Sequence, residues 1–413
     1  MFRYVVESGL QINDTRFTTG TFGFRRVSRH WNEVAIGSPR LWVWWVSGAV
    51  SAWPQFNARS KDTPLLLTWR HQPHRSIRDT LMDPTIPARL RTLDFSGTNN
   101  DLEYLLGAFN SSSPSNLSSV RLHATLYDEH EVREHPAGFL SLSFPNLSKL
   151  DIKNFLPDFS SPIFTTSNLV SLKLGVPCGG GSYYTRSQFS QILQRHPNLE
   201  ELHLWQGGMP RVEPSIPLVP IVLPRLVDLR LQGTTAIVAE FVGLIGMSSP
   251  LHNVDINLES TNTFTDPNSA VKRILTLYYE CQGLDYPRRA DQLTISSDLG
   301  KESLVFDARS ESTRTSHPTY NLKLRFNEVH NKLVEEICLL FPLDHVHEFA
   351  AVDLDLPSDE YRRMLREMVG LSHLELDNLD IGPVLDALDY DTQCEGMHKK
   401  PTETALKHSH VYR

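Results

Sequence analysis

A six-residue pattern recurs along most of the chain: an apolar residue, two arbitrary residues, an apolar residue, a polar residue and a final apolar residue. The first copy occupies residues 90–95 (LRTLDF) and the last residues 371–376 (LSHLEL). The copies between them begin at Leu117, Leu147, Leu169, Leu199, Leu226, Leu251, Ala290, Thr319 and Phe349. No single unit of this size can bury its own apolar face, so the units must stack on one another. The pattern therefore predicts an extended array.

The spacing between copies, 22 to 39 residues, indicates what each unit contains. Pattern and spacing resemble those of leucine-rich repeats, in which each unit supplies one strand and a returning segment that is often a helix. The resemblance implies a leucine-rich-repeat-type α/β solenoid over residues 90–390. Apolar residues at intervals of three and four predict helices in several returning segments, at residues 101–109, 187–196, 270–281 and 359–369.

Two stretches depart from this array. Residues 300–318 are rich in Ser, Thr and charged side chains, which predicts a loose excursion between two repeats. Residues 391–413 are polar and contain several His and Lys residues, which predicts a disordered tail.

The polar residue of each copy faces away from its apolar neighbours, because successive side chains of a strand point to opposite faces. In chain order these residues are Asp94, Arg121, Asp151, Lys173, His203, Arg230, Asp255, Thr294, Lys323, Asp353 and Glu375. Stacked strands lie about 4.8 Å apart, so these side chains would form a ladder. The first four alternate in charge, which is favourable between adjacent strands. Either the ladder binds a partner, or it only keeps that face soluble.

The repeats also contain a group of side chains suited to binding a protein. Arg and aromatic residues are the types most enriched at binding hot spots, and they occur here at strand positions and strand ends. We predict that a protein target binds at Arg121, Lys173, His203, Trp205 and Arg230.

The N-terminal residues differ in kind from the repeats. Helical spacing of apolar residues predicts a helix over residues 24–36, which Gly37-Ser38-Pro39 ends. The sequences VSRHW at 27–31 and SPRLW at 38–42 are similar to the second half of an F-box, of the F-box-like type common in fungal proteins. Residues 53–69 resemble the helix and first strand that lead from such a domain into leucine-rich-type repeats.

The resemblance covers most of the chain and implies its domain organisation. A small all-α F-box-like block occupies residues 1–47, a connecting helix and first strand occupy 48–89, and the repeats follow at 90–390. An F-box usually opens with Leu-Pro before its first helix, whereas residues 1–6 (MFRYVV) resemble the middle of that helix. The F-box is therefore expected to be incomplete at its N-terminus.

The resemblance implies a substrate receptor of an SCF-type ubiquitin ligase. The N-terminal helices would bind the Skp-type adaptor and, through it, the cullin, while the solenoid would hold a protein target. Adaptor contacts would come from apolar side chains, namely Phe2, Val5, Val27, Trp31, Leu41 and Trp42. Some of these must pack inside the block instead, Trp31 above all. The alternative is a non-catalytic repeat scaffold for protein–protein interaction that no longer binds the adaptor.

Composition excludes several other classes of function. A formal charge of −8 and a pI near 6.1 give no general attraction to nucleic acid. No apolar run approaches the roughly 18 residues of a transmembrane helix, so no membrane partner is expected. The four Cys are isolated, which favours a cytoplasmic or nuclear protein with reduced thiols. No catalytic motif is recognisable, so we expect no enzyme activity, cofactor or metal; an enzyme with an unrecognised site is the remaining hypothesis.

Overall fold

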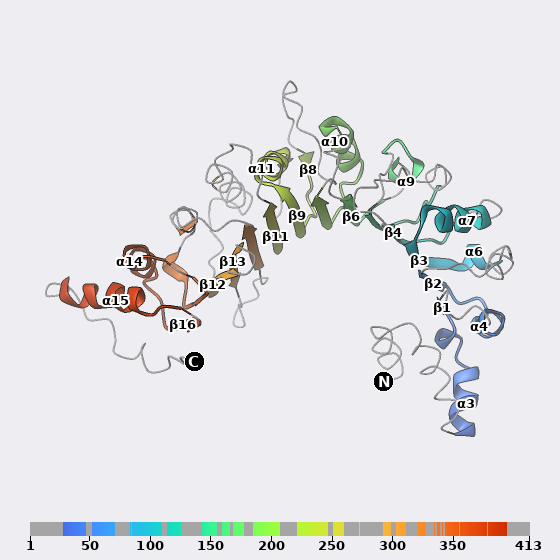
Figure 1. The fold of residues 1–413 in the computed structure, drawn as a ribbon. Helices are drawn as coiled ribbons and strands as arrows, with labels where there is room; N and C mark the ends of the chain where they lie inside the picture. Colours follow the sequence, from blue (N-terminus) through green and yellow to red (C-terminus); the bar gives the residue numbers. More distant parts are fainter. Residues whose placement is uncertain are drawn as a thin grey trace. The chain divides into compact units, whose positions relative to one another are not determined.

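The computed structural model of the 413-residue chain forms two compact units, Met1–Gly180 (unit 1) and Gly181–Arg413 (unit 2). Figure 1 shows the ribbon of both units. The structure describes residues 28–46, 52–70, 83, 85–109, 114–124, 143–154, 159–165, 168–176, 185–206, 221–246, 251–259, 272, 292–298, 303–310, 320–326, 334, 337–338, 341, 343–354, 356–377 and 379–394.

Unit 1 contains an open sheet whose described strands are all parallel and follow one another in chain order. These strands are β1 (Trp44–Val46), β2 (Leu65–Arg70), β3 (Leu90–Gly97), β4 (Ser119–Ala124), β5 (Lys149–Lys153) and β6 (Ser171–Val176). The helices of this unit are α3 (Arg29–Ile36), α4 (Trp53–Ser60), α6 (Thr85–Arg89), α7 (Asn99–Phe109) and α9 (Pro162–Thr165), with a 3₁₀ helix at Pro39–Leu41. Strand β1 was not expected within the all-α block.

Unit 2 also contains an open, mainly parallel sheet, but its strands do not follow chain order. In spatial order they are β7 (Glu201–Gln206), β9 (Asp228–Thr234), β11 (Asn253–Glu259), β14 (Tyr320–Phe326), β13 (Ser303–Ser310), β12 (Gln292–Asp298), β15 (Glu348–Val352) and β16 (His373–Asp377). Strands β8 (Ile221–Val222) and β10 (Ile245–Gly246) form a separate parallel pair. The helices are α10 (Arg186–Arg195), α11 (Thr235–Leu244), α14 (Ser358–Glu367) and α15 (Gly382–Cys394), with a 3₁₀ helix at Leu343–His345.

The departure from chain order lies in β12, β13 and β14. Strand β13 runs antiparallel to both of its neighbours, so these three strands form a meander, and β11 pairs with β14 instead of β12. The prediction of a loose excursion at 300–318 is therefore wrong for residues 303–310. The alternating Leu304, Phe306 and Ala308 explain the strand, because Phe306 and Ala308 are buried on one face.

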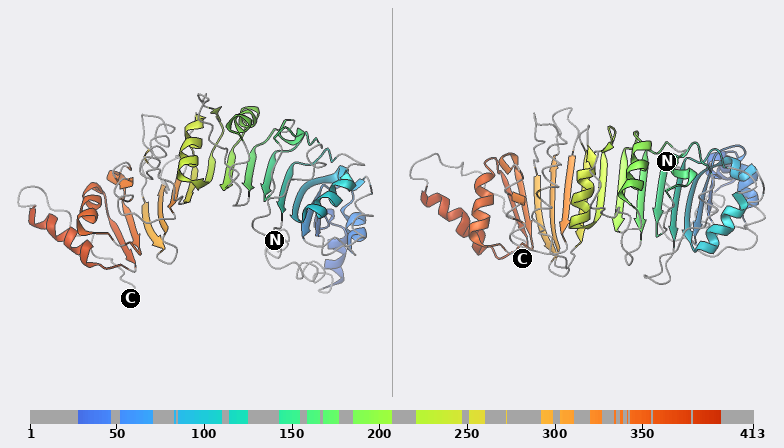
Figure 2. Two further views of the ribbon diagram at one scale, coloured as in Figure 1. Left: turned by 45° about the horizontal axis from the view of Figure 1, so that its top comes forward. Right: turned by 90° about the horizontal axis from the view of Figure 1, so that it is seen from above.

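The predicted anchors are buried in most described copies. Leu93, Phe95, Leu202, Leu204 and Leu229 are each at most 1% exposed. Helices α7, α10 and α11 lie on this apolar side, as the two views in Figure 2 show. The predicted helices at 101–109, 187–196 and 359–369 are confirmed as α7, α10 and α14. The predicted helix at 270–281 lies outside the described residues except for Lys272.

The register predicted for the copy at Phe349 is wrong. Strand β15 buries Phe349 and Ala351 and pairs Ala350 with Glu375, so Ala350 occupies the ladder position that was expected for Asp353. Asp353 follows the strand with a φ of 51°. After β16, α15 continues to Cys394, four residues into the tail that was predicted to be disordered; residues 395–413 lie outside the described part of the chain.

A tight turn precedes several strands and explains the recurring Pro-Asn-Leu. In the turn Phe144–Leu147, the Leu147 N–H donates to the Phe144 carbonyl at 3.0 Å, with proline at the second position, where its fixed φ is favourable. The Asn146 amide then donates to the Ser115 carbonyl of the preceding repeat at 2.8 Å. The equivalent Asn116 donates to the Ala88 carbonyl at 2.7 Å. These two asparagine side chains therefore link their own repeats to the preceding repeat by a hydrogen bond.

A tryptophan cluster closes the N-terminal end of the unit 1 core. Trp42, Trp45 and Trp53 are each at most 1% exposed. The Trp42 indole donates to the Ala35 carbonyl at 2.7 Å, and the Trp45 and Trp53 rings lie 5.1 Å apart. Terminal repeats need such a cap because they have a neighbour on one side only.

Candidate binding surface on the polar sheet faces

The face of each sheet opposite the core carries charged side chains in register. In unit 1, Asp94 pairs with Arg121, Arg121 with Asp151 and Asp151 with Lys173 along neighbouring strands. The alternation predicted for these four residues is therefore confirmed. The Arg121 guanidinium lies 3.1 Å from the Asp151 carboxylate and 3.9 Å from that of Asp94. Each carboxylate also has a second cationic or imidazole neighbour, Arg70 at 3.4 Å from Asp94 and His123 at 3.5 Å from Asp151.

In unit 2, charges alternate in spatial order from Arg230 to Asp307, although chain order is broken. His203 and Asp255 each pair with Arg230, and Asp255 also pairs with Lys323. Lys323 then pairs with Asp307 of β13, and Asp307 with Thr294. The strand that the sequence reading missed thus supplies the carboxylate that follows Lys323 in the ladder.

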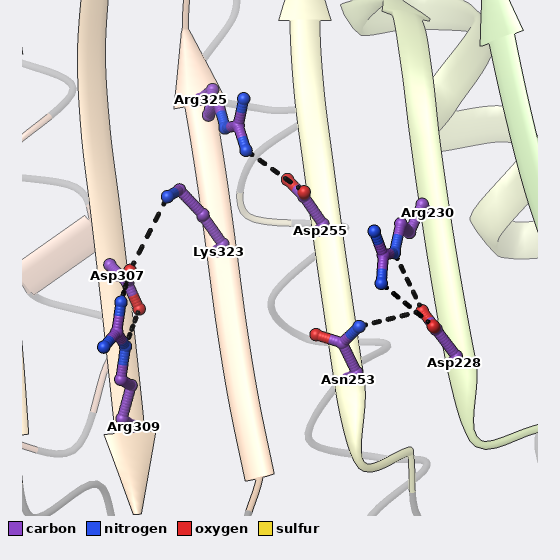
Figure 3. A network of polar contacts seen from close by, with 8 residues as sticks. All are labelled: Asp228, Arg230, Asn253, Asp255, Asp307, Arg309, Lys323 and Arg325. Atoms are coloured by element: carbon purple, nitrogen blue, oxygen red, sulfur yellow. Dashed lines mark hydrogen bonds and ion pairs between the residues drawn. The ribbon is translucent and has the colours of Figure 1, made fainter. Parts of the chain in front are cut away.

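Two bidentate ion pairs within single strands anchor this face (Figure 3). Arg230 donates through Nε and Nη2 to the two Asp228 oxygens, both at 3.2 Å. Arg309 does the same with Asp307, at 3.0 and 2.7 Å. Residues two apart in a strand share a face, which is why the pattern Asp-x-Arg can form this pair.

Asp228 is the most highly coordinated carboxylate of the unit 2 face. Besides Arg230, the Asn253 amide donates to it at 2.9 Å, and the His203 ring nitrogen Nε2 lies 3.3 Å away. Desolvation is the largest single influence on this carboxyl and would raise its pKa. The hydrogen bonds and charges of His203 and Arg230 together exceed that influence and lower the pKa of Asp228 below its usual value.

The same balance holds for Asp151 in unit 1. Burial acts to raise the pKa of this carboxyl, but the hydrogen bond and charge of His123, with the nearby Lys153 and Arg121, lower it overall. Both carboxylates therefore stay ionised at neutral pH and hold their basic neighbours in fixed positions.

The five residues predicted to bind a target are distributed over both units. In unit 1, the Arg121 side chain is 52% exposed and Lys173 is half-buried. In unit 2, Arg230 is 43% exposed and Trp205 is half-buried, with its ring 5.6 Å from that of His203. His203 itself is only 3% exposed, so it supports Asp228 and Trp205 from beneath the surface. Sequence reasoning missed Asp228, Asn253, Asp307, Arg309 and Arg325, which share the unit 2 face.

The residues predicted to bind the adaptor are described only in part. Phe2, Val5 and Val27 lie outside the described residues, and Trp31 is described only by its backbone in α3. Leu41 is half-buried in the 3₁₀ helix, whereas Trp42 lies in the tryptophan cluster. Among the side chains described in residues 28–46, Val34 and Ile36 of α3 are the exposed large apolar ones, at 39% and 40%.

The described His and Cys side chains lie in small pairs or in the core. No group of three or more His, Cys, Asp or Glu within the described residues could hold a metal ion. The His345 and Asp344 side chains form one pair at 2.8 Å, and the His347 ring nitrogen Nδ1 lies 2.8 Å from the Gly370 carbonyl oxygen. Burial raises the pKa of the Cys338 thiol to about 12, which leaves it protonated and unreactive.

The comparisons with known proteins leave the family open. Neither a protein-family model nor a curated protein sequence matches the chain. Within the described part of the chain, no helix is long and apolar enough to cross a membrane.

Proposed function

We propose that this chain is a substrate-receptor subunit of an SCF-type ubiquitin ligase, in which the polar sheet faces hold a protein target. One observation carries the target-binding half of the proposal. In both units helices take the apolar side of the strands, and the opposite side presents charged side chains fixed in register by carboxylates. A broad, preorganised surface of this kind suits a protein partner, because little side-chain entropy is lost when it binds.

The adaptor-binding half rests on the F-box-like sequence at residues 27–42 and on the exposed apolar pair of α3. Val34 and Ile36 are the described side chains best placed to meet an apolar partner surface. The ligase would then act by proximity, because holding a target near the ubiquitin-charged enzyme raises its effective concentration.

A second function is favoured by the position of Trp42. Its side chain completes the core of unit 1, so the sequence SPRLW at 38–42 has a structural role without any adaptor. The chain would then be a repeat scaffold that binds a protein partner and no ligase.

Direct binding to a purified Skp-type adaptor separates the two functions. We expect the full chain to bind, and the double variant Val34→Glu with Ile36→Glu to lose binding. The two side chains point to different sides of α3, so the variant places a charge on whichever side meets the adaptor. Glu33→Gln, on the same exposed helix, is the matched control and should bind normally. Failure of the unchanged chain to bind the adaptor would favour the scaffold. Full binding by the double variant would show that α3 does not contact the adaptor.

A further inference from the structure

Strand β16 is the last strand of the unit 2 sheet, and one of its two edges is open. Among the described residues its only strand neighbour is β15, to which it runs parallel. Its side chains alternate between exposed and half-buried, in contrast to the buried anchors of the other repeats. Helix α15, which follows it, packs against α14.

The backbone groups that face the open edge follow from two hydrogen bonds. The His373 N–H donates to the His347 carbonyl at 3.0 Å, and the Asp377 carbonyl accepts from the Asp353 N–H at 3.1 Å. The backbone groups of successive strand residues point to opposite neighbours. Residues 373, 375 and 377 therefore face β15, and the N–H and C=O groups of Leu374 and Leu376 face outward. Natural sheets usually cover or disrupt an edge that offers such groups.

The side chains around this edge differ on its two faces. On the polar face, β15 and β16 carry Glu348, His373, Glu375 and Asp377 and no Lys or Arg, so carboxylates outnumber the one imidazole there. On the other face, Leu374 and Leu376 are only half-buried, and the nearby segment leaves Ile381 and Leu385 40% and 50% exposed. An added strand would place alternate side chains against each of these faces.

We propose that the open edge of β16 accepts an extended segment of a partner protein in which basic residues alternate with apolar ones. The backbone of that segment would pair with the outward groups of Leu374 and Leu376. Its basic side chains would lie beside Glu375 and Asp377, about 4.8 Å away across the new strand pair. Its apolar side chains would cover Leu374 and Leu376. This inference goes beyond the ligase proposal and does not depend on adaptor binding.

The test is titration of the full chain with a fluorescein-labelled eight-residue peptide of alternating lysine and valine, followed by fluorescence anisotropy. We expect saturable binding, and about fivefold weaker binding by the double variant Glu375→Gln with Asp377→Asn, which loses both opposite charges. The matched control, Glu103→Gln with Glu200→Gln, removes the same charge from exposed positions elsewhere and should bind normally.

Two changes address the backbone. Leu376→Pro removes a backbone N–H that faces the open edge, and it leaves every hydrogen bond between β16 and β15 in place. The fold should therefore be retained while peptide binding is lost. Two modified peptides are compared, one N-methylated at every lysine and the other at every valine. Only one of them should lose binding, because only every second residue of the added strand directs its N–H toward β16.

Three results would overturn the proposal. The first is no saturable binding of the alternating peptide. The second is equal binding of a peptide with four consecutive lysines and four consecutive valines, which would indicate charge attraction without strand pairing. The third is a concentration-dependent dimer, detected by sedimentation, that Leu376→Pro abolishes, because a second copy of this chain would then occupy the edge.

Discussion

Replacing Asp228 with Asn should destabilise unit 2 in a way that depends on pH. The Asp228 side chain is only 19% exposed and receives two bonds from Arg230 and one from Asn253. An asparagine keeps the shape but removes the charge and turns one acceptor into a donor that faces other donors. Hydrogen bonds to charged groups contribute about 1.5–3 kcal/mol each. Arg230 is 43% exposed, so water recovers part of that loss.

The net loss in the free energy of unfolding should therefore be about 2 kcal/mol at pH 7, which corresponds to a decrease in Tm of roughly 4–8 °C for a unit of this size. Asp255→Asn is the matched control. This carboxylate receives one bond from Arg325 at 3.2 Å and is 25% exposed, so its loss should stay below about 1 kcal/mol. Thermal unfolding followed by circular dichroism measures both.

The pH dependence tests the electrostatic origin of this loss. The pKa of Asp228 is lower in the folded than in the unfolded chain, so its ionisation stabilises the fold at pH values above the unfolded pKa of about 3.9. That contribution is lost as the pH falls through the folded pKa. The difference in Tm between the unchanged chain and Asp228→Asn should thus shrink as the pH falls below about 4. A difference under about 1 °C at pH 7, or one that does not shrink in acid, would refute the reasoning.

Three further predictions concern packing and reactivity. Leu202→Asp puts a charge at a position that is 0% exposed and should cost several kcal/mol; a variant that melts like the unchanged chain would show that the β7 register is wrong. Arg89→Leu removes a guanidinium that binds Asn57, Ser60 and the Thr63 carbonyl, and should cost about 2 kcal/mol in unit 1 by urea unfolding. Cys338, with a pKa of about 12, should resist iodoacetamide at pH 8 until the chain is unfolded, and rapid labelling of the folded chain would contradict its burial.

The strand positions were predictable because the signal is local. In the copy at 90–95, Leu93 and Phe95 lie on one face and Asp94 on the other whatever the neighbouring repeat does. The meander of β12, β13 and β14 was not predictable in the same way. Its order depends on which strands pair across long separations, and nothing in the six-residue pattern encodes that choice. The alternation of Leu304, Phe306 and Ala308 was the available signal, hidden by the polar residues around it.

The register of β15 shows a second limit of sequence reasoning. Residues 349–352 (FAAV) are all apolar, so the six-residue pattern can start at Phe349 or, three residues earlier, at Val346. Both starting positions give the strand an apolar face. The structure selects the frame with Val346 buried, at 0% exposed. Asp228, the missed partner of Arg230, and Asn253, which donates to Asp228, were missed for a different reason. Each lies one position before an anchor, at a position that the pattern treats as arbitrary.

The order of charges along the unit 2 ladder makes its two ends chemically different. From Arg230 to Asp307 each charge has an opposite neighbour in register, so that part of the face is neutralised internally and would recognise a partner by shape and by Trp205. The alternation stops at Thr294 and Ala350, which carry no charge. Glu375, the next position, therefore has no basic residue beside it on β15. Because Glu375 and Asp377 lie on the edge strand, where His373 is the one imidazole beside them, the excess of carboxylates and the outward backbone groups occur together, and the proposed basic extended segment would match both.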